Sequence, residues 1–404
     1  MKYLIVGGGV AGVMAAQAIA RADPTAQVHV FSAEPHPYYQ RPRLWEFIAG
    51  KIERDALYFR PPVWYAERGI HLHLGVRVTE IDPHAHRLTL ADSSRVEYDR
   101  LLLAMGGHPF VPPFEGVRKK GVFTLRTLED ALAIKEYAQG IATAAVIGGG
   151  LLGLETAWAL LSPGLEVSVI EFVPHLLPRQ LDVEGAQILQ SRLEALGLRI
   201  VTDAATEAIL GDERAVGVRL KDGRVIDGEL VLISTGIRSR VELAREAGLE
   251  VNRGMVVDEQ LRASATDVYA AGDVAEFEGV VYGIIPAAIE QARAAAMNMV
   301  SSSSATYGGT VPATTLKIVG IDLICLGEAT ATGDEFTILR RSDAADGVYR
   351  RLALREGKIV GAILLGDTQN VQSLKKLIAT GRDVSAYSGR LLDESFDLKA
   401  LAYG

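Results

Sequence analysis

A strand–glycine–helix pattern occurs twice in this chain, and no other feature constrains the fold as much. In the first copy, an apolar run at 3–6 leads into Gly7, Gly9 and Gly12, followed by an alanine-rich stretch at 13–20. We predict a buried strand, a tight turn and a helix. The glycines would allow the turn, a close approach to a pyrophosphate, and close packing of helix on strand. Phosphate would lie at the helix N-terminus, where N–H groups and the helix dipole favour negative charge. One copy alone could also be an ordinary strand–turn–helix with packing glycines.

The second copy repeats the whole pattern. Its strand at 145–147 leads through Gly148, Gly150 and Gly153 into a helix at 154–161. Each glycine lies 141 positions after its counterpart (148 − 7, 150 − 9, 153 − 12). Two complete units predict two dinucleotide sites in an α/β fold with two Rossmann-like domains.

Size and charge exclude several classes of protein. The 404 residues suffice for two or three domains. A net charge of −8 gives no sign of nucleic-acid or anionic membrane binding, and no apolar run approaches the roughly 20 residues that span a bilayer. Met1 leads almost directly into the first strand, so we expect a cytoplasmic protein without a secretory signal. The single cysteine, Cys325, is expected to be a buried core thiol and cannot supply a redox-active pair.

An acid after the second strand of each unit is a candidate for binding a ribose hydroxyl. Glu34 follows the strand at 28–31, 22 positions past the first motif (34 − 12), with a solvated loop glutamate as the alternative. Glu171 ends the strand at 167–171, 18 positions past the second motif (171 − 153). A carboxylate there accepts from a 2′-OH and repels a 2′-phosphate, which favours NADH over NADPH.

Residues 35–45 are rich in proline and aromatic residues, which predicts a rigid loop rather than a helix. Arg41 and Arg43 in this loop are placed to meet a second phosphate or a flavin edge, with surface charge as the competing interpretation. Two histidine pairs at spacing i, i+2, at 71 and 73 and at 84 and 86, lack a third ligand at metal spacing. We therefore predict no metal site.

The two glycine-ended strands at 101–106 and 230–236 indicate crossovers between domains. We predict a first dinucleotide-binding domain at 1–113 and 237–307, with a second inserted at 114–236. An apolar strand ends at Gly272-Asp273, a helix follows at about 286–299, and Ser301 to Ser304 form a linker. Residues 308–404 form an α+β domain, with strand-like runs at 314–319, 322–327, 348–354 and 358–365 and a helix near 370–380.

With both motifs and Gly272-Asp273 in place, the chain resembles the two-dinucleotide-binding-domain flavoprotein oxidoreductases. The stretches 37–42, 125–130 and 176–182 resemble NADH:rubredoxin reductases and the FAD-binding N-terminal part of the NADH-dependent nitrite reductase large subunit, and 311–322 with 358–367 look closest to the latter. The resemblance implies FAD on the first unit and NADH on the second. It also implies hydride transfer to FAD and release of electrons to a small carrier such as rubredoxin, a ferredoxin or a nitrite reductase component.

The resemblance also implies roles for individual residues. Glu155 would lie near the nicotinamide–flavin stack and Lys317 would approach the isoalloxazine. Related ferredoxin-type reductases pair a lysine with the carboxylate at the Glu155 position, and the aligned residue here is Glu46; our hypothesis is that Arg43 replaces that lysine. The implied cofactor-binding residues are Gly7, Gly9, Val10, Ala11, Gly12, Glu34, Arg41, Val78, Ala104, Gly106, Arg126, Gly148, Gly150, Leu151, Leu152, Gly153, Glu171, Gly236, Gly272, Asp273 and Ile285, with Asp273 at the ribityl chain.

Departures from the family pattern also inform the prediction. Ala104-Met105-Gly106 stands where the family usually has Ala-Thr-Gly, and the family's ribose acid falls at or beside Ala33. The loop after the first unit lacks both the C-x-x-x-x-C of disulfide reductases and the single cysteine of peroxidases and water-forming oxidases, so both chemistries are excluded. Without cysteine clusters for an iron–sulfur or sirohaem module, we expect no nitrite reduction by this chain itself.

Two other functions fit the same motifs. One is an NADH oxidase or diaphorase acting on quinone or oxygen. The other is a redox-sensing subunit whose bound nucleotide controls association. Independently of the function, two roles of the third domain fit the sequence: it forms a homodimer interface, or it only covers the flavin.

Overall fold

The computed structural model describes residues 1–162, 164–302, 304–318, 320–393 and 395–404, without the side chain of Lys317. Two compact units make up the chain. The first contains Met1–Arg41, Glu53–His108 and Ile237–Thr310, and the second contains Pro42–Ile52, Pro109–Gly236 and Val311–Gly404. The chain thus leaves the first unit and returns to it, in keeping with the predicted insertion. The three-domain boundaries remain a prediction.

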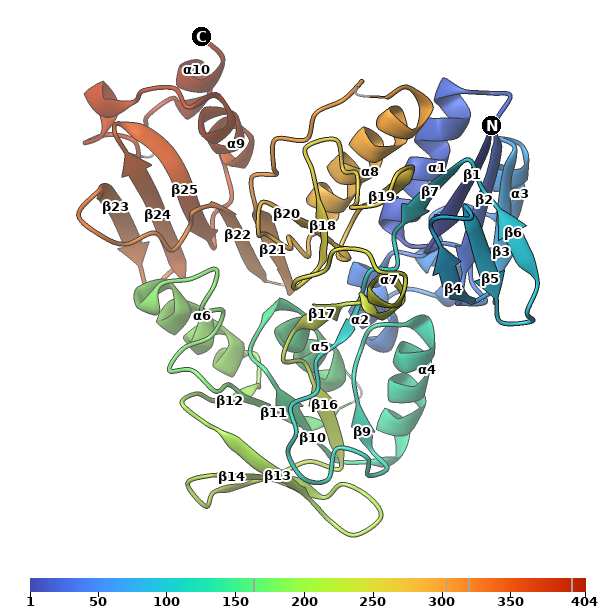
Figure 1. Ribbon diagram of the computed structural model, residues 1–404. Coiled ribbons are helices and arrows are strands. Elements are labelled where there is room, and N and C mark those ends of the chain that lie inside the picture. The colour runs from blue at the N-terminus through green and yellow to red at the C-terminus, as the bar shows by residue number, and fades with distance from the viewer. Residues whose placement is uncertain (163, 303, 319, 394) are drawn as a thin grey trace. The chain divides into compact units, whose positions relative to one another are not determined.

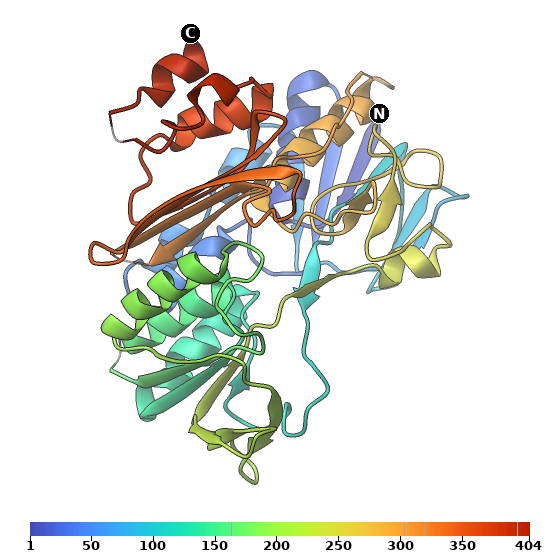
Figure 2. The same cartoon turned by 90° about the vertical axis from the view of Figure 1, so that its left-hand side faces the viewer.

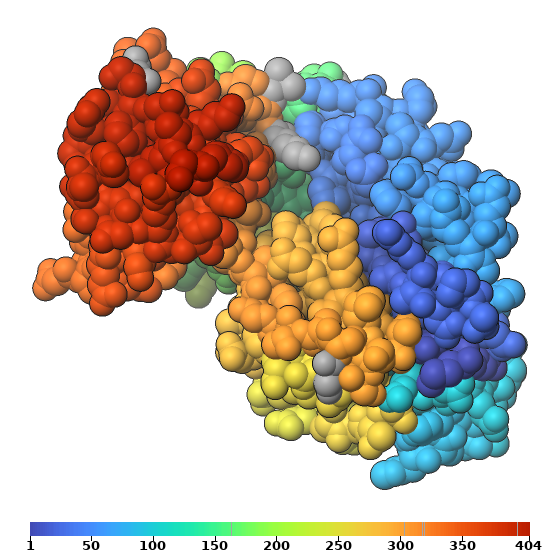
Figure 3. Space-filling view, turned by 90° about the horizontal axis from the view of Figure 1, so that it is seen from above, coloured from blue at the N-terminus to red at the C-terminus, as the bar shows by residue number. Residues whose placement is uncertain are grey.

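A parallel sheet in the order β19-β7-β1-β2-β3 forms the core of the first unit (Figure 1). Its strands are β1 (Lys2–Val6), β2 (Gln27–Ser32), β3 (Ile70–Leu74), β7 (Arg100–Leu103) and β19 (Val268–Ala270). Residues 3–5 of the central strand are fully buried, as the apolar run predicted. Helices α1 (Val10–Ala22) and α8 (Ile285–Val300) pack together beside this sheet, and Figure 3 shows their two segments, far apart in sequence, side by side.

Smaller elements complete the first unit. An antiparallel sheet contains β4 (Val78–Asp82), β5 (Arg87–Leu90) and β6 (Arg95–Glu97). β8 (Gly107–Pro109) pairs with β17 (Ile237–Ser239), and β18 (Met255–Val257) pairs with β20 (Ala275–Phe277). The short helices are α3 (Pro62–Ala66) and α7 (Glu242–Glu246).

The second unit repeats the parallel design in the order β12-β11-β10-β16-β9. Its strands are β9 (Val122–Phe123), β10 (Thr143–Ile147), β11 (Glu166–Ile170), β12 (Arg199–Val201) and β16 (Leu230–Ile233). Helices α4 (Leu128–Tyr137), α5 (Leu151–Leu161) and α6 (Val183–Ala195) accompany this sheet. A small antiparallel sheet contains β13 (Thr206–Leu210), β14 (Gly217–Leu220) and β15 (Val225–Asp227).

An antiparallel sheet in the order β21-β22-β25-β24-β23 dominates the C-terminal part of the second unit. Its strands are β21 (Ala313–Ile318), β22 (Ile321–Gly327), β23 (Phe336–Asp343), β24 (Val348–Arg355) and β25 (Lys358–Leu365). Helices α9 (Val371–Thr380) and α10 (Leu398–Tyr403) cover one face through a leucine-rich cluster (Figure 2). The predicted α+β character is confirmed, whereas β23 and α10 were not predicted. Residue 319 of one predicted strand and residue 303 of the predicted linker lie outside the described residues.

The loop prediction for 35–45 is wrong at its end. A single 3₁₀ turn occupies Arg41–Arg43, and helix α2 begins at Leu44 and runs to Ile48. Four of its five residues are buried and the helix contacts α4 and α5. Burial of this apolar side outweighs the loop preference of the preceding prolines.

Candidate dinucleotide sites

The first glycine turn has the backbone that its sequence predicted. Gly7 has φ +122°, and a Cβ there would lie 2.1 Å from the carbonyl oxygen of Ala104. A Cβ at Gly12 would lie 1.9 Å from the carbonyl oxygen of Gly7. Both positions therefore exclude any side chain. At Gly9, by contrast, a Cβ would meet no atom within 4 Å. Packing does not require this glycine, so its bare backbone leaves room for a ligand.

The second turn has the same three features. Gly148 has φ +118°, and a Cβ there would lie 2.3 Å from the carbonyl oxygen of Ser234. A Cβ at Gly153 would lie 2.1 Å from the Gly148 carbonyl oxygen, while one at Gly150 would again meet nothing within 4 Å. Each unit therefore contains a glycine turn with open space beside its middle glycine, Gly9 or Gly150, and we call this space a cradle. A Cβ would narrow the cradle, whereas a bound pyrophosphate needs it open.

Both cradles open onto a helix N-terminus. Gly9 caps α1 and Gly150 caps α5 in extended conformation, and within the described residues neither helix start has a side-chain cap or an acid in its first turn. The first helical residues are Val10 and Ala11 in α1, and Leu151 and Leu152 in α5. N–H groups left without intrahelical partners, together with the helix dipole, make these ends suited to phosphate.

Glu171 follows β11 directly, at the second cradle. Its carboxylate accepts hydrogen bonds from the backbone N–H groups of Gly149 at 2.7 Å and Val173 at 3.1 Å. These bonds fix the carboxylate at the strand end, where a ribose hydroxyl is recognised in folds of this type.

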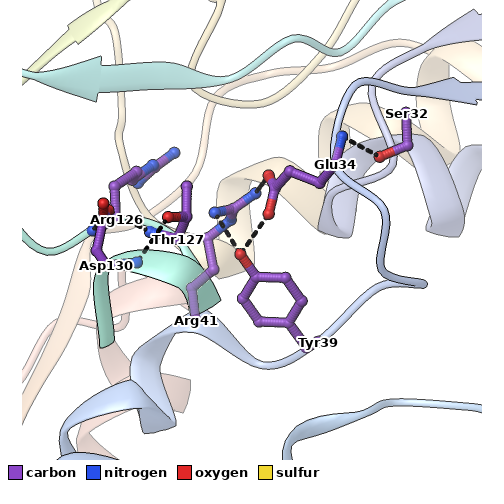
Figure 4. Close-up of polar contacts among 7 residues, drawn as sticks. All are labelled: Ser32, Glu34, Tyr39, Arg41, Arg126, Thr127 and Asp130. Atoms are coloured by element: carbon purple, nitrogen blue, oxygen red, sulfur yellow. Dashed lines mark hydrogen bonds and ion pairs between the residues drawn. The ribbon is translucent and has the colours of Figure 1, made fainter. Parts of the chain in front are cut away.

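Glu34 lies two residues past the end of β2 and contacts two residues of the following loop. Its carboxylate accepts hydrogen bonds from the Tyr39 hydroxyl and the Arg41 guanidinium, each at 2.5 Å (Figure 4). Burial favours a higher pKa for Glu34, but Arg41 and Tyr39 outweigh it and hold the pKa below its ordinary value. The structure thus joins two predicted site residues in one ion pair and adds Tyr39, which sequence reasoning missed.

The Gly272-Asp273 turn lies against the start of α1. Gly272 has φ +83°, and a Cβ there would lie 3.0 Å from the Cβ of Ala11. The Ser239 hydroxyl donates to the Asp273 carbonyl at 2.6 Å. The turn therefore lies close to the start of α1, and contact of Asp273 with a ribityl chain remains a prediction.

The remaining predicted residues of the first unit lie on several elements. Ala104 follows β7, and its carbonyl crowds Gly7. Gly106 has φ +68°. Val78 begins β4 and is buried, and Ile285 begins α8, which has no acid in its first turn. Their contact with a cofactor remains a prediction.

The remaining predicted residues of the second unit include three with assigned catalytic roles. Glu155 is buried in α5, at 7% exposure. Arg43 forms an ion pair with Glu46 at 2.8 Å. Lys317 lies on β21, and its side chain lies outside the described part of the chain.

Two more of these residues lie in loops. Arg126 precedes α4, where Thr127 and Asp130 form a capping box. The backbone N–H of Arg126 donates a hydrogen bond to the Asp130 carboxylate at 2.8 Å (Figure 4). Gly236 has φ +111° and is exposed, with its carbonyl accepting from the Phe110 N–H at 2.9 Å.

The histidines on β3 have a partner that the sequence did not reveal. His29 on β2 stacks on His71 and His73, with ring centroids 4.7 and 5.3 Å apart. His29 Nδ1 lies 3.0 Å from His73 Nε2. Within the described residues, no group of three or more histidine, cysteine or acidic side chains is arranged to hold a metal ion. His84 and His86 lie in the turn between β4 and β5.

Two glycine turns, each leading from the central strand of a parallel sheet into a helix, define an oxidoreductase built from two dinucleotide-binding folds. Residues 1–298 match the family model described as pyridine nucleotide-disulphide oxidoreductase, and residues 312–382 match the rubredoxin NAD⁺ reductase C-terminal domain. The chain belongs to this family of flavoproteins, which bind FAD and NAD(P)H. No helix in the described ranges is long and apolar enough to cross a bilayer.

Individual relatives support this assignment. The chain is 36% identical to nitrite reductase [NAD(P)H] of Bacillus subtilis over 96% of its own length and 48% of that protein. It is 30% identical to NADH-rubredoxin oxidoreductase of Clostridium acetobutylicum, over 94% and 95% of the two chains. A chain in the crystal structure of the covalent putidaredoxin reductase–putidaredoxin complex matches with TM-score 0.90 and 26% identity, over 99% of this chain and 98% of that one. The chain spans about half the length of the nitrite reductase that it matches.

Proposed function

We propose that this protein is an FAD-dependent NADH oxidoreductase that passes electrons to a separate acceptor, such as rubredoxin, a ferredoxin or a nitrite reductase component. The observation that carries the proposal is the pair of open cradles at Gly9 and Gly150 in one chain. FAD would occupy the domain at 1–113 and 237–307, and NADH the domain at 114–236. Bound FAD supplies the change from two-electron to one-electron chemistry. The protein's own residues bind and orient the two cofactors, a proximity effect.

Specificity for NADH over NADPH would come from Glu171. Its carboxylate is fixed by two backbone N–H groups, at 2.7 and 3.1 Å, so it cannot easily swing away from a 2′-phosphate. A 2′-phosphate at the same point would meet a like charge, whereas a 2′-OH can donate to the carboxylate.

Alignment of the nicotinamide would involve Glu155 and, in our hypothesis, Arg43. Burial of Glu155 favours a partner for its carboxylate. Arg43 forms an ion pair with Glu46 of helix α2 at 2.8 Å, so positive charge is present at this position. Substituting Arg43 by alanine should slow flavin reduction by NADH. If the reduction rate does not change, Arg43 does not replace the family lysine.

Disulfide reduction is not part of the proposal. Cys325 is the only cysteine of the sequence and is buried in β22. Burial raises the pKa of its thiol to about 12, which disfavours the reactive thiolate.

Anaerobic stopped-flow spectroscopy tests the proposal. NADH should bleach the flavin absorbance of the purified protein faster than NADPH does, and rubredoxin, a ferredoxin or a nitrite reductase component should then restore it. A protein that holds no flavin, or that NADH does not bleach, would overturn the proposal. Rapid restoration by oxygen or quinone alone would instead identify an oxidase or diaphorase. Slow bleaching with NADH-dependent oligomerisation would favour a nucleotide-sensing subunit.

A further inference from the structure

We propose that Gln291 is a positioning residue that, together with Ser239, holds Asp273 in place to bind FAD. The inference rests on the proposed FAD site in the first unit. It adds two side chains that no sequence motif indicated.

Gln291 lies in the middle of α8 and is 1% exposed. Buried alanines, including Ala288, Ala292 and Ala295, surround it along the helix. A primary amide in such surroundings is costly unless it forms hydrogen bonds. Its Oε1 accepts a hydrogen bond from the Gly272 N–H at 2.9 Å. The helix thus uses a buried polar side chain to hold a loop of the proposed site.

Ser239 holds the same turn from the other end. It is the last residue of β17, is buried, and donates through Oγ to the Asp273 carbonyl at 2.6 Å. The bond to Gln291 fixes the backbone N–H of Gly272, and the bond from Ser239 fixes the backbone carbonyl of Asp273. The two-residue segment is therefore held at both ends by side chains from two different elements.

The geometry of the turn gives these bonds a consequence for ligand binding. Gly272 has φ +83° and lies so close to Ala11 that a Cβ there would be 3.0 Å away from the Ala11 Cβ. The turn is thus packed against the first residues of the helix that would receive the FAD pyrophosphate. A rotation about Gly272 would change the direction of the Asp273 side chain, because glycine itself offers little resistance to rotation.

The charge of Asp273 acts in the same region. Burial favours a lower pKa for Arg41, but Tyr39, Glu34 and Asp273 together outweigh burial and raise the pKa above its ordinary value. An aspartate held beside a helix N-terminus and an arginine can accept hydrogen bonds from the hydroxyl groups of a polyol chain, while the helix end receives phosphate. This combination suits the ribityl diphosphate part of FAD.

A double-mutant cycle on FAD affinity tests the inference. The dissociation constant of FAD is measured by fluorescence titration of apoprotein for the wild type, Gln291→Met, Asp273→Ala and the double variant. Loss of one hydrogen bond to the turn should raise the dissociation constant about tenfold in Gln291→Met. In the Asp273→Ala background, the same substitution should change the dissociation constant by less than about twofold, because Gln291 is proposed to act on FAD only through the position of Asp273. The control Gln17→Met, an exposed residue of α1, should leave it unchanged.

Equal losses in the two backgrounds would overturn the inference, because Gln291 would then support only the fold. An unchanged FAD affinity in Gln291→Met would do the same. If Gln291→Met does not fold, Ser239→Ala replaces it in the cycle, with the same expected coupling to Asp273. A wild-type apoprotein that binds no FAD would instead disprove the proposed function, so the two failures are distinguishable.

Discussion

The carboxylate of Glu171 and the backbone N–H of Gly149 form a 2.7 Å hydrogen bond within the second glycine turn. A Cβ at Gly149 would lie 3.1 Å from the same carboxylate oxygen, so the residue between the motif glycines must also be small. The acid proposed to select the ribose therefore also shapes the turn proposed to bind the pyrophosphate. One substitution at Glu171 should affect both affinity and coenzyme selectivity.

We expect Glu171→Ala to weaken NADH binding by roughly 10- to 100-fold, the loss typical for hydrogen bonds to a charged group. NADPH binding should fall less, because the substitution also removes the repulsion of the 2′-phosphate. The ratio of the two affinities, measured by titration of flavin reduction, should thus shift toward NADPH. Glu166→Ala, an exposed position at the start of the same strand, is the matched control. An unchanged ratio would contradict this role of Glu171.

The glycines of each motif separate into packing and ligand positions, which alanine substitutions can distinguish. Gly12→Ala should destabilise the apoprotein by about 1–3 kcal/mol, because its Cβ would lie 1.9 Å from the Gly7 carbonyl oxygen. Gly9→Ala meets no protein atom and should change stability by less than about 1 kcal/mol while weakening FAD binding. Urea unfolding and FAD titration measure the two effects. In the second motif, Gly153→Ala should likewise lower stability, whereas Gly150→Ala should weaken NADH binding. If Gly9→Ala binds FAD as tightly as the wild type, Gly9 is not a ligand position.

The sequence predicted both cradles because each depends on neighbouring residues. Strand, glycine turn and helix follow one another within about 20 residues, and the backbone requirement of each glycine is local. The C-terminal strands were also predictable where their residues are buried, as in β25. Strand β23 was missed because most of its residues are exposed, which left no apolar run to indicate a strand.

Contacts between distant segments could not be predicted from the sequence. The sequence places Tyr39 in a loop motif and indicates no partner for it, whereas its hydroxyl donates a hydrogen bond to Glu34. The bond between Ser239 and Asp273 joins residues 34 positions apart, and no local pattern indicates it. The first two residues of α2, Leu44 and Trp45, fall in the predicted loop because the neighbouring prolines are a strong local signal. The partners of the helix's apolar side lie at least 80 positions away, in α4 and α5.

A buried charge network holds α6 to the C-terminal sheet within the second unit. Asp182 Oδ2 accepts from the Tyr349 hydroxyl at 2.6 Å and lies 3.3 Å from Nε of Arg351, a side chain with 0% exposure. Its other oxygen accepts from the Gly185 N–H and caps α6. Asp182→Asn keeps the shape but removes the counter-charge of a buried guanidinium, which should destabilise the protein by about 3–5 kcal/mol. Urea unfolding measures the change.

The matched control for this network is Glu184→Gln, which removes an exposed acid from the first turn of the same helix. It should change the unfolding free energy by less than about 1 kcal/mol. If Asp182→Asn is as mild as this control, the buried pair contributes little to stability.

Stability should also depend on pH through His29. Burial, followed by the charges of His71, His73 and Lys2, lowers the His29 pKa from 6.5 to about 4. The folded protein therefore keeps this imidazole neutral in a range where the unfolded chain binds a proton. Stability is fully present above about pH 6.5 and should be lost progressively as the pH falls toward 4, by on the order of 1–2 kcal/mol after solvent screening is considered.

Thermal unfolding at several pH values between 4 and 7.5 measures this dependence. His29→Phe should flatten it, because the variant keeps an aromatic ring in the stack and carries no titratable group there. The ring of Phe31 already stacks on His73 at 4.6 Å, so this part of the sheet accommodates a phenyl ring. His84→Gln, at an exposed turn position, should retain the wild-type slope. Equal slopes in His29→Phe and the wild type would show that the acid sensitivity arises elsewhere.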